Sequence, residues 1–126
     1  MQCKYEYKSP VLIMDGKTRC HREGVSDRGF CLLHDDWKYK TREQAEQAFR
    51  KEIEKDIENY EGCILPEIVL SDRIFKHGLH FAYSKIEGDV WFSEAVIGGN
   101  VFFDGAAIVG NAIFNEAKIE GNVMFN

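Results

Sequence analysis

An 11-residue repeat fills the second half of the chain and restricts its fold more than any other feature of the sequence. Each unit reads Phe-x-x-Ala-x-Ile-x-Gly-x-Val-x, and five columns keep register over four copies. Such a sustained period is typical of architectures that stack one structural unit on the next. The columns are Phe81, Phe92, Phe103, Phe114 and Phe125; Ser84, Ala95, Ala106 and Ala117; Ile86, Ile97, Ile108 and Ile119; Gly88, Gly99, Gly110 and Gly121; and Val90, Val101, Ala112 and Val123.

The spacing inside each unit predicts short β-strands. From the alanine column to the next phenylalanine the columns alternate at period 2, so one side of each strand points inward. Gly-Asp or Gly-Asn pairs recur once per unit, and pairs such as Ser93-Glu94 mark a second break, so each unit has two corners. A coil of one unit has no room inside for Phe, Ile and Val together. We therefore expect two units per coil, roughly 22 residues and four faces. A meander of antiparallel strands is the alternative.

The spacing Phe103-x-x-Ala106-x-Ile108 resembles the pentapeptide repeat, in which a small and a bulky apolar residue fill a right-handed four-sided β-helix. The unit departs from a strict period of five, because Ile97 and Phe103 lie six residues apart. The resemblance covers roughly residues 70–126 and implies a mainly β fold, with the solenoid over residues 62–126. We further expect the repeats to continue beyond Asn126, or two chains to meet at this open edge, because no capping repeat follows.

Four potential metal ligands lie within the first 34 residues: Cys3, Cys20, Cys31 and His34. Cys31-Leu-Leu-His34 can bind one metal ion from a single tight turn, and Cys3 with Cys20 would complete a tetrahedron. Three thiolates and one imidazole are the ligands of a closed, structural zinc site. The alternative is that the cysteines are small core residues and His34 lies on the surface.

A cysteine near Met1, then Gly16-Lys17-x-x-Cys20 and Gly29-Phe30-Cys31-x-x-His34, resembles the small zinc knuckle that precedes pentapeptide-like repeats in certain prokaryotic proteins. The resemblance implies a knuckle over residues 1–40 with Cys3, Cys20, Cys31 and His34 as its ligands. His21 is the only substitute ligand that the segment offers. We interpret Cys63, outside the segment, as a core thiol.

Residues 41–61 predict one amphipathic helix between the knuckle and the repeats. Thr41-Arg-Glu-Gln44 has the form of a capping box, and Gly62 with Pro66 ends the segment. One apolar stripe follows at spacings of three or four: Ala45, Phe49, Ile53, Ile57 and Tyr60. We expect the stripe to cap the first coil of the solenoid; a partner-binding or coiled-coil face is the alternative.

No catalytic motif accompanies these elements: the chain has no phosphate-binding loop, Gly-x-Ser-x-Gly or His-Glu-x-x-His. A zinc site with four protein ligands also leaves no position for a substrate, so we expect a non-catalytic protein.

The residue before each phenylalanine should point outward, and it is apolar in four copies: Trp91, Phe102, Ile113 and Met124. Two residues per face would stack, Trp91 with Ile113 and Phe102 with Met124, on opposite faces. These residues predict a scaffold that binds a protein partner; scattered surface apolar residues are the alternative.

A nucleic-acid-related function is the second hypothesis. Zinc knuckles can bind nucleic acid, but residues 1–60 carry 12 basic and 12 acidic side chains, whereas a binder normally shows a basic stripe. Some pentapeptide-repeat proteins are acidic mimics of DNA that inhibit topoisomerases, and residues 61–126 carry 4 basic and 9 acidic side chains. The N-terminus lacks the apolar core of a signal peptide and no segment has the length of a membrane span, so we expect a cytoplasmic protein.

Overall fold

The computed structural model describes residues 1–9, 19–24 and 28–125. In these residues the chain forms one α-helix, α2 (Arg42–Glu54), followed by a series of two-residue strands. The strands are β1 (Ile64–Leu65), β2 (Ile68–Val69), β3 (Ile74–Phe75), β4 (Leu79–His80), β5 (Lys85–Ile86), β6 (Val90–Trp91), β7 (Val96–Ile97), β8 (Val101–Phe102), β9 (Ala107–Ile108), β10 (Ala112–Ile113), β11 (Lys118–Ile119) and β12 (Val123–Met124).

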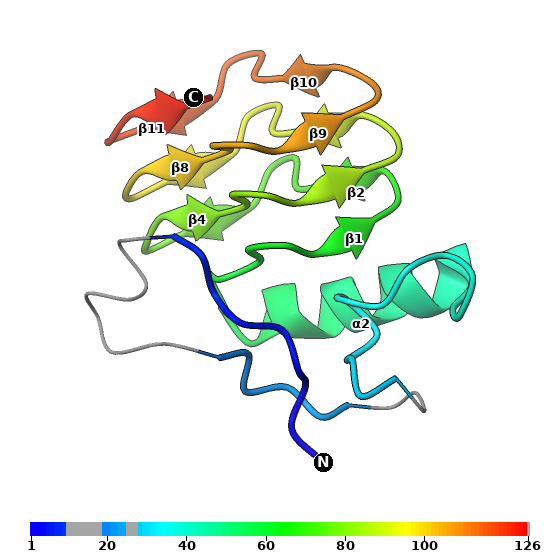
Figure 1. Ribbon diagram of the computed structural model, residues 1–126. Helices are drawn as coiled ribbons and strands as arrows, with labels where there is room; N and C mark the ends of the chain where they lie inside the picture. The colour runs from blue at the N-terminus through cyan, green and yellow to red at the C-terminus, as the bar shows by residue number, and fades with distance from the viewer. Residues whose placement is uncertain (10–18, 25–27, 126) are drawn as a thin grey trace.

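The strands form four parallel sheets, one on each side of a coil. Every fourth strand pairs with the one above it, giving the orders β1-β5-β9, β2-β6-β10, β3-β7-β11 and β4-β8-β12. Ile68 pairs with Val90 and Val90 with Ala112, so one coil contains 22 residues. The sequence-based prediction of a four-sided solenoid is confirmed, and the antiparallel meander is wrong. Figure 1 shows the coils stacked above α2.

Like side chains stack inside the solenoid. The rings of Tyr60, Phe81, Phe103 and Phe125 form one column, with successive centroids 5.3, 5.4 and 5.2 Å apart. Phe92 and Phe114 stack in a second column at 5.0 Å. Burial decreases toward the last coil: Phe81 and Phe103 are buried, whereas Phe125 is 56% exposed.

The glycine column allows successive coils to approach closely. A Cβ atom on Gly99 would lie 2.7 Å from the backbone nitrogen of Gly78 in the coil below, closer than any real contact. The residue after each glycine adds a polar ladder, because the side chains of Asp89 and Asn100 accept hydrogen bonds from the backbone of Asn111 (2.7 Å) and Asn122 (2.8 Å). These corners therefore contribute packing as well as turns.

Helix α2 is shorter than the predicted helix over residues 41–61. Thr41 and Gln44 form the predicted capping box, but α2 ends at Glu54 and Asp56 adopts a left-handed φ of 60°. Tyr60 lies beyond the helix, where its N–H donates to the carbonyl of His80 at 2.7 Å. The aromatic column of the solenoid therefore starts at Tyr60, within the segment predicted as helix, because the ring of Tyr60 stacks on that of Phe81.

The helix covers the open lower end of the solenoid. Ala45, Phe49 and Ile53 form its buried stripe, and the Phe49 ring lies 4.9 Å from that of Tyr60. Helix α2 thus lies beneath the first coil, on the side where the sequence predicted a cap (Figure 1). Among the described residues, no helix has the length and apolarity needed to span a bilayer.

Candidate metal centre

Two antiparallel segments position Cys3 and Cys20. The N–H of Cys3 donates to the carbonyl of Arg22 at 2.8 Å, and the N–H of Cys20 donates to the carbonyl of Tyr5 at 2.9 Å. Cys3 lies opposite Arg22 and Cys20 lies opposite Tyr5, so the two cysteines are diagonal neighbours on one face of the paired segments. The two cysteines, 17 residues apart in sequence, are thereby brought together with both thiols fully buried.

The Cys31–His34 segment forms the tight turn that its spacing predicts. The N–H groups of His34 and Asp35 both donate to the carbonyl of Cys31, at 3.1 and 3.0 Å. The N–H of Lys4 donates to the carbonyl of Gly29 at 2.9 Å, which holds this turn against the N-terminal segment. All four predicted ligands are buried, and their ligand atoms lie within 4.8 Å of one another.

The distances fit a tetrahedral ion. His34 Nδ1 lies 3.5 Å from Cys3 Sγ and 3.3 Å from Cys31 Sγ. Around zinc, bond lengths of about 2.3 Å to sulfur and 2.0 Å to nitrogen place such atoms about 3.6 Å apart. These two distances match a tetrahedral zinc site, and all four ligand atoms are close enough together to bind one metal ion. His21 is exposed and lies outside the cluster, while the Gly16-Lys17 pair falls outside the described residues.

The second ring nitrogen of His34 faces away from the cluster. His34 Nε2 lies 2.7 Å from the carbonyl oxygen of Glu61, so the N–H belongs on Nε2 and the Nδ1 lone pair faces the sulfur atoms. The Tyr5 ring stacks on the imidazole at 4.1 Å. Both contacts fix the ring orientation that a metal ligand requires.

Three thiols at this spacing cannot all ionise without a cation. Hydrogen bonding with Cys20 lowers the pKa of Cys3 and raises the pKa of Cys31. Cys31 N–H also donates to Cys3 Sγ at 3.3 Å, a contact that stabilises a thiolate there. A divalent cation would remove the conflict by neutralising the sulfur charge.

Arg22 joins the cluster to the helix and to the first coil. Its side chain, 8% exposed, places Nη1 3.7 Å from Cys20 Sγ and forms an ion pair with Glu52 of α2. Nη2 donates to the carbonyl of Asn59 at 2.7 Å, and the guanidinium lies over the ring of Tyr60. One buried cation thus contacts three parts of the molecule.

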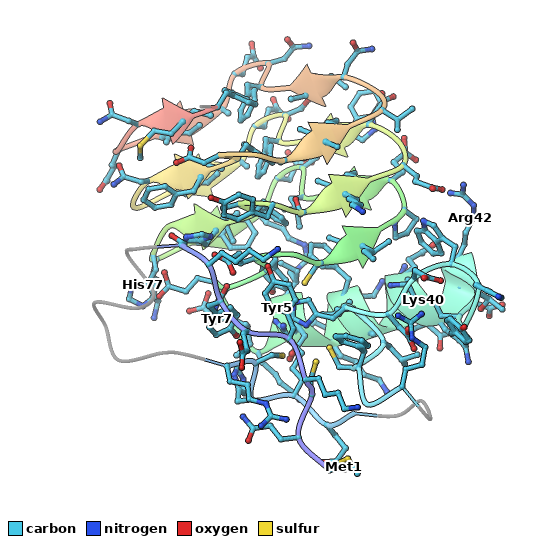
Figure 2. All side chains as sticks on the ribbon, viewed as in Figure 1. Met1, Tyr5, Tyr7, Lys40, Arg42 and His77 are labelled. Atoms are coloured by element: carbon cyan, nitrogen blue, oxygen red, sulfur yellow. The ribbon has the colours of Figure 1, made fainter. Side chains whose placement is uncertain are left out.

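Glu61 is a fully buried carboxylate that holds the N-terminal segment on the solenoid. It accepts hydrogen bonds from the backbone of Lys8 (2.8 Å) and Ser9 (2.6 Å) and from the Tyr5 hydroxyl (3.1 Å). Burial, followed by the charge of Glu61, raises the pKa of Tyr5, so its hydroxyl remains a donor. Figure 2 shows Tyr5 on the segment beneath the solenoid.

Lys40 makes the corresponding connection at the other end of the knuckle. Its buried Nζ donates to the carbonyls of Leu32 and Ile64, each at 2.6 Å, and lies over the Trp37 ring. Burial lowers the pKa of Lys40 to about 8. No sequence pattern marks the roles of Lys40, Arg22 and Glu61, because each is an ordinary charged residue in a charged segment.

Cys63 is buried, as expected for a core thiol. Its Sγ lies 3.9 Å from His34 Nε2, on the side of the ring away from the sulfur cluster. His80 differs from the expectation that the residue before each phenylalanine is exposed. It is only 6% exposed because the N-terminal segment covers it, with His80 Nε2 3.1 Å from Ser9 Oγ.

The predicted interaction residues lie on the outer surface of the solenoid, each partly exposed. Trp91 pairs in register with Ile113 on β6 and β10. Phe102 pairs with Met124 on β8 and β12. The stacking predicted for both pairs is confirmed, and the two sheets lie on opposite sides of the coil.

Comparison with known proteins concerns the solenoid. Residues 75–126 match the sequence profile of a family described as pentapeptide repeats, with nine copies. Neither the curated proteins nor the solved structures contain a significant match to the chain. The profile match and the four parallel sheets of 22-residue coils show that residues 75–126 form a solenoid of pentapeptide repeats.

Proposed function

We propose that the chain is a non-catalytic scaffold in which a structural zinc ion holds the knuckle and a solenoid face binds a protein partner. The main support for a scaffold function is the regular column of apolar side chains on the outside of the solenoid. Val69, Trp91 and Ile113 lie in register on β2, β6 and β10, and Val69 is 62% exposed. Neighbouring members lie about 4.8 Å apart, the spacing of paired strands.

Zinc is the proposed metal because the donor set is soft. Three cysteines and one histidine suit zinc and disfavour magnesium or calcium, which prefer oxygen ligands. The four ligands fill a tetrahedral shell, so the ion would supply cross-linking and no catalysis. Its structural effect would be to hold Cys3 and Cys20 against the Cys31–His34 turn.

A pair of matched double variants tests the scaffold. Trp91→Ser with Ile113→Ser removes one column, and Phe102→Ser with Met124→Ser removes the opposite one. Lys85→Ser, on the exposed outer side of β5, is the control. A protein captured from the source cell should bind the purified wild-type chain directly and lose at least about tenfold in affinity with one double variant only.

Equal binding of that partner to wild type and to both double variants would contradict the proposal. Light scattering of the purified chain covers the case in which the partner is a second copy. In that case one double variant should shift the dimer toward monomer, whereas Lys85→Ser should leave the dimer unchanged. Zinc content and the circular dichroism spectrum should be the same in all variants.

One observation favours a second candidate, an acidic mimic of DNA that inhibits a topoisomerase. Asp72, Glu94 and Glu116 occupy the same corner of successive coils, all with a left-handed φ near 60°. Hydrogen bonding with Asp72 and Glu116 raises the pKa of Glu94. Inhibition of purified gyrase by wild type, lost in Glu94→Gln with Glu116→Gln, would support this function over the scaffold.

Direct binding of nucleic acid by the knuckle has less support. Arg19 donates to the carbonyl of Cys3 at 2.9 Å, Arg22 is buried, and Arg28 forms an ion pair with Asp36 at 3.2 Å. These three basic side chains are therefore engaged within the protein. A salt-dependent shift of a DNA probe by the purified chain would restore the hypothesis.

A further inference from the structure

A cavity of about 340 Å³ lies where α2 meets the first coil, away from the metal centre. The helix contributes Phe49, Ile53 and Arg50 to its walls, and the solenoid contributes Pro66 and the segment that follows it. Its volume falls within the range of small-molecule sites.

Apolar side chains from the helix and from the solenoid form one wall of the cavity. Phe49 and Ile53 face it from the buried stripe of α2, and Pro66 faces it from the solenoid without a backbone N–H to offer. Val69 stands at the mouth, 62% exposed. This wall suits a short aliphatic or aromatic group, since nothing on it requires a polar partner.

The charged side chains that line the cavity carry a small positive excess, although the chain as a whole carries a net charge of -5. Arg42, Arg50 and Arg73 line the cavity, against Glu46 and Glu67. The ion pairs of Arg42 and Arg50 are made by exposed side chains and hold these guanidinium groups only weakly. In Figure 2 Arg42 extends from the end of α2 toward the solenoid.

Arg73 differs from the other two arginines. Within the described part of the chain it forms no ion pair. Of the competing acids, Glu46 is held by Arg50, and Glu67 accepts a hydrogen bond from Trp91 Nε1 at 2.9 Å. Among the three arginines, Arg73 is therefore the one most available to bind an anionic ligand.

We propose that this cavity binds a small amphipathic carboxylate, with the carboxylate on Arg73 and the apolar body against Phe49 and Ile53. A guanidinium can donate two parallel hydrogen bonds to a carboxylate. The apolar body supplies the part of the affinity that distinguishes the ligand from inorganic anions. The proposal requires neither the scaffold function nor zinc, although Val69 lies both in the apolar column and in the cavity lining.

Calorimetry with the whole, zinc-loaded chain tests the site, with octanoate as the probe. Octan-1-ol carries the same chain without the charge, and acetate carries the charge without the chain. Octanoate should bind at least about tenfold more tightly than either. In NMR spectra it should shift the amide signals of Ile53 and Arg73 and leave those of Cys31 and His34 in place.

Variants locate the contact. Arg73→Gln should weaken octanoate binding by about tenfold, whereas Lys118→Gln, which removes one exposed cation from the same side of a higher coil, should leave it unchanged. Glu67→Gln should tighten binding by removing a competing charge. Equal affinity for octanoate and octanol, equal effects of the two cation variants, or no binding at millimolar octanoate would each overturn the proposal.

Discussion

The knuckle and the solenoid are stabilised in opposite ways. In the solenoid each coil places the same side chains on those of the coil below, so the rings of Phe81 and Phe103 stack as those of Phe92 and Phe114 do. The knuckle has no such repeated contacts. It is joined to the rest of the chain by single buried charges, each with several partners, of which Arg22 and Glu61 are the clearest.

This difference implies different responses to change. A substitution in the solenoid core removes one of several equivalent contacts, and neighbouring coils retain theirs, as in other stacked repeats. A substitution in the knuckle removes a contact that nothing else duplicates. We therefore expect the largest effects at the metal centre, intermediate effects at the buried charges and the smallest effects on the outer surface of the solenoid.

The largest expected effect is that of Cys31→Ser. The purified wild-type chain should contain about one zinc ion, and the variant almost none, because binding of structural zinc in small domains supplies on the order of 10 kcal/mol of folding free energy. Residues 1–9, 19–24 and 28–40 should then lose their protection from hydrogen exchange, while the circular dichroism signal of the strands persists. Elemental analysis and exchange mass spectrometry measure both.

Cys63→Ser is the matched control for this prediction. Cys63 is as buried as Cys31 but lies outside the four-ligand cluster, so its substitution should leave the zinc content unchanged. Zinc-free wild-type protein purified without chelator would rule out the metal site. Loss of the strand signal in Cys31→Ser would show that the solenoid depends on the knuckle, against the comparison drawn above.

The second prediction concerns Arg22→Met. This substitution leaves the Glu52 carboxylate and the Asn59 carbonyl without their buried partner. Removing one member of a buried ion pair costs about 3–5 kcal/mol, measured as the free energy of unfolding in urea. Arg42→Met breaks an exposed pair with Glu87 and should cost less than about 1 kcal/mol. Equal losses in the two variants would mean that Arg22 does not join the two regions.

The third prediction is a smaller effect for Glu61→Gln. An amide has one acceptor oxygen where the carboxylate has two, so at least one of the donors from Lys8 and Ser9 loses its partner. We expect a loss of about 2 kcal/mol and faster hydrogen exchange at those two amides. Glu58→Gln is the control, because Glu58 is exposed. Unchanged exchange at Lys8 and Ser9 would contradict the assigned role of Glu61.

The contrast between repeated contacts in the solenoid and unique contacts in the knuckle also explains which features could be predicted from the sequence. The coil length, the inward columns and the stacking of Trp91 with Ile113 follow from a period that every unit repeats, and the capping box of α2 is a local pattern. The end of α2 at Glu54 was missed, because the apolar spacing continues to Tyr60 while that ring packs in the solenoid. The partners of Glu61 lie more than 50 residues away along the chain, and no local pattern identifies them.

The sequence singled out the four residues that the structure brings together in the candidate metal centre, but it did not predict their surroundings. Cysteine is rare and its spacing is informative, so Cys3, Cys20 and Cys31 were recognisable in sequence. Stacking of Tyr5 on His34, and the hydrogen bond from His34 to the carbonyl of Glu61, depend on how the segments fold together. A tyrosine and a backbone carbonyl carry no signal of that role.

The smallest expected effect is at Trp91, and its neighbour in sequence provides the sharpest control. Trp91 lies on the outer side of β6, partly exposed, with one hydrogen bond to Glu67. Phe92 is fully buried in the aromatic column. Trp91→Ala should therefore cost about 1 kcal/mol or less, since surface substitutions rarely cost more. Phe92→Ala should cost about 3–5 kcal/mol, because it leaves a cavity in a packed core.

The comparison of these two variants tests the inward and outward assignment of the whole repeat. Both substitutions remove a large aromatic ring from adjacent positions, so their difference reports which side of the strand faces the core. Thermal or urea unfolding measures it directly. A loss at Trp91 as large as that at Phe92 would mean that the ring of Trp91 is buried. The apolar column would then belong to the core of the protein, and the partner-binding face would have to lie elsewhere on the solenoid.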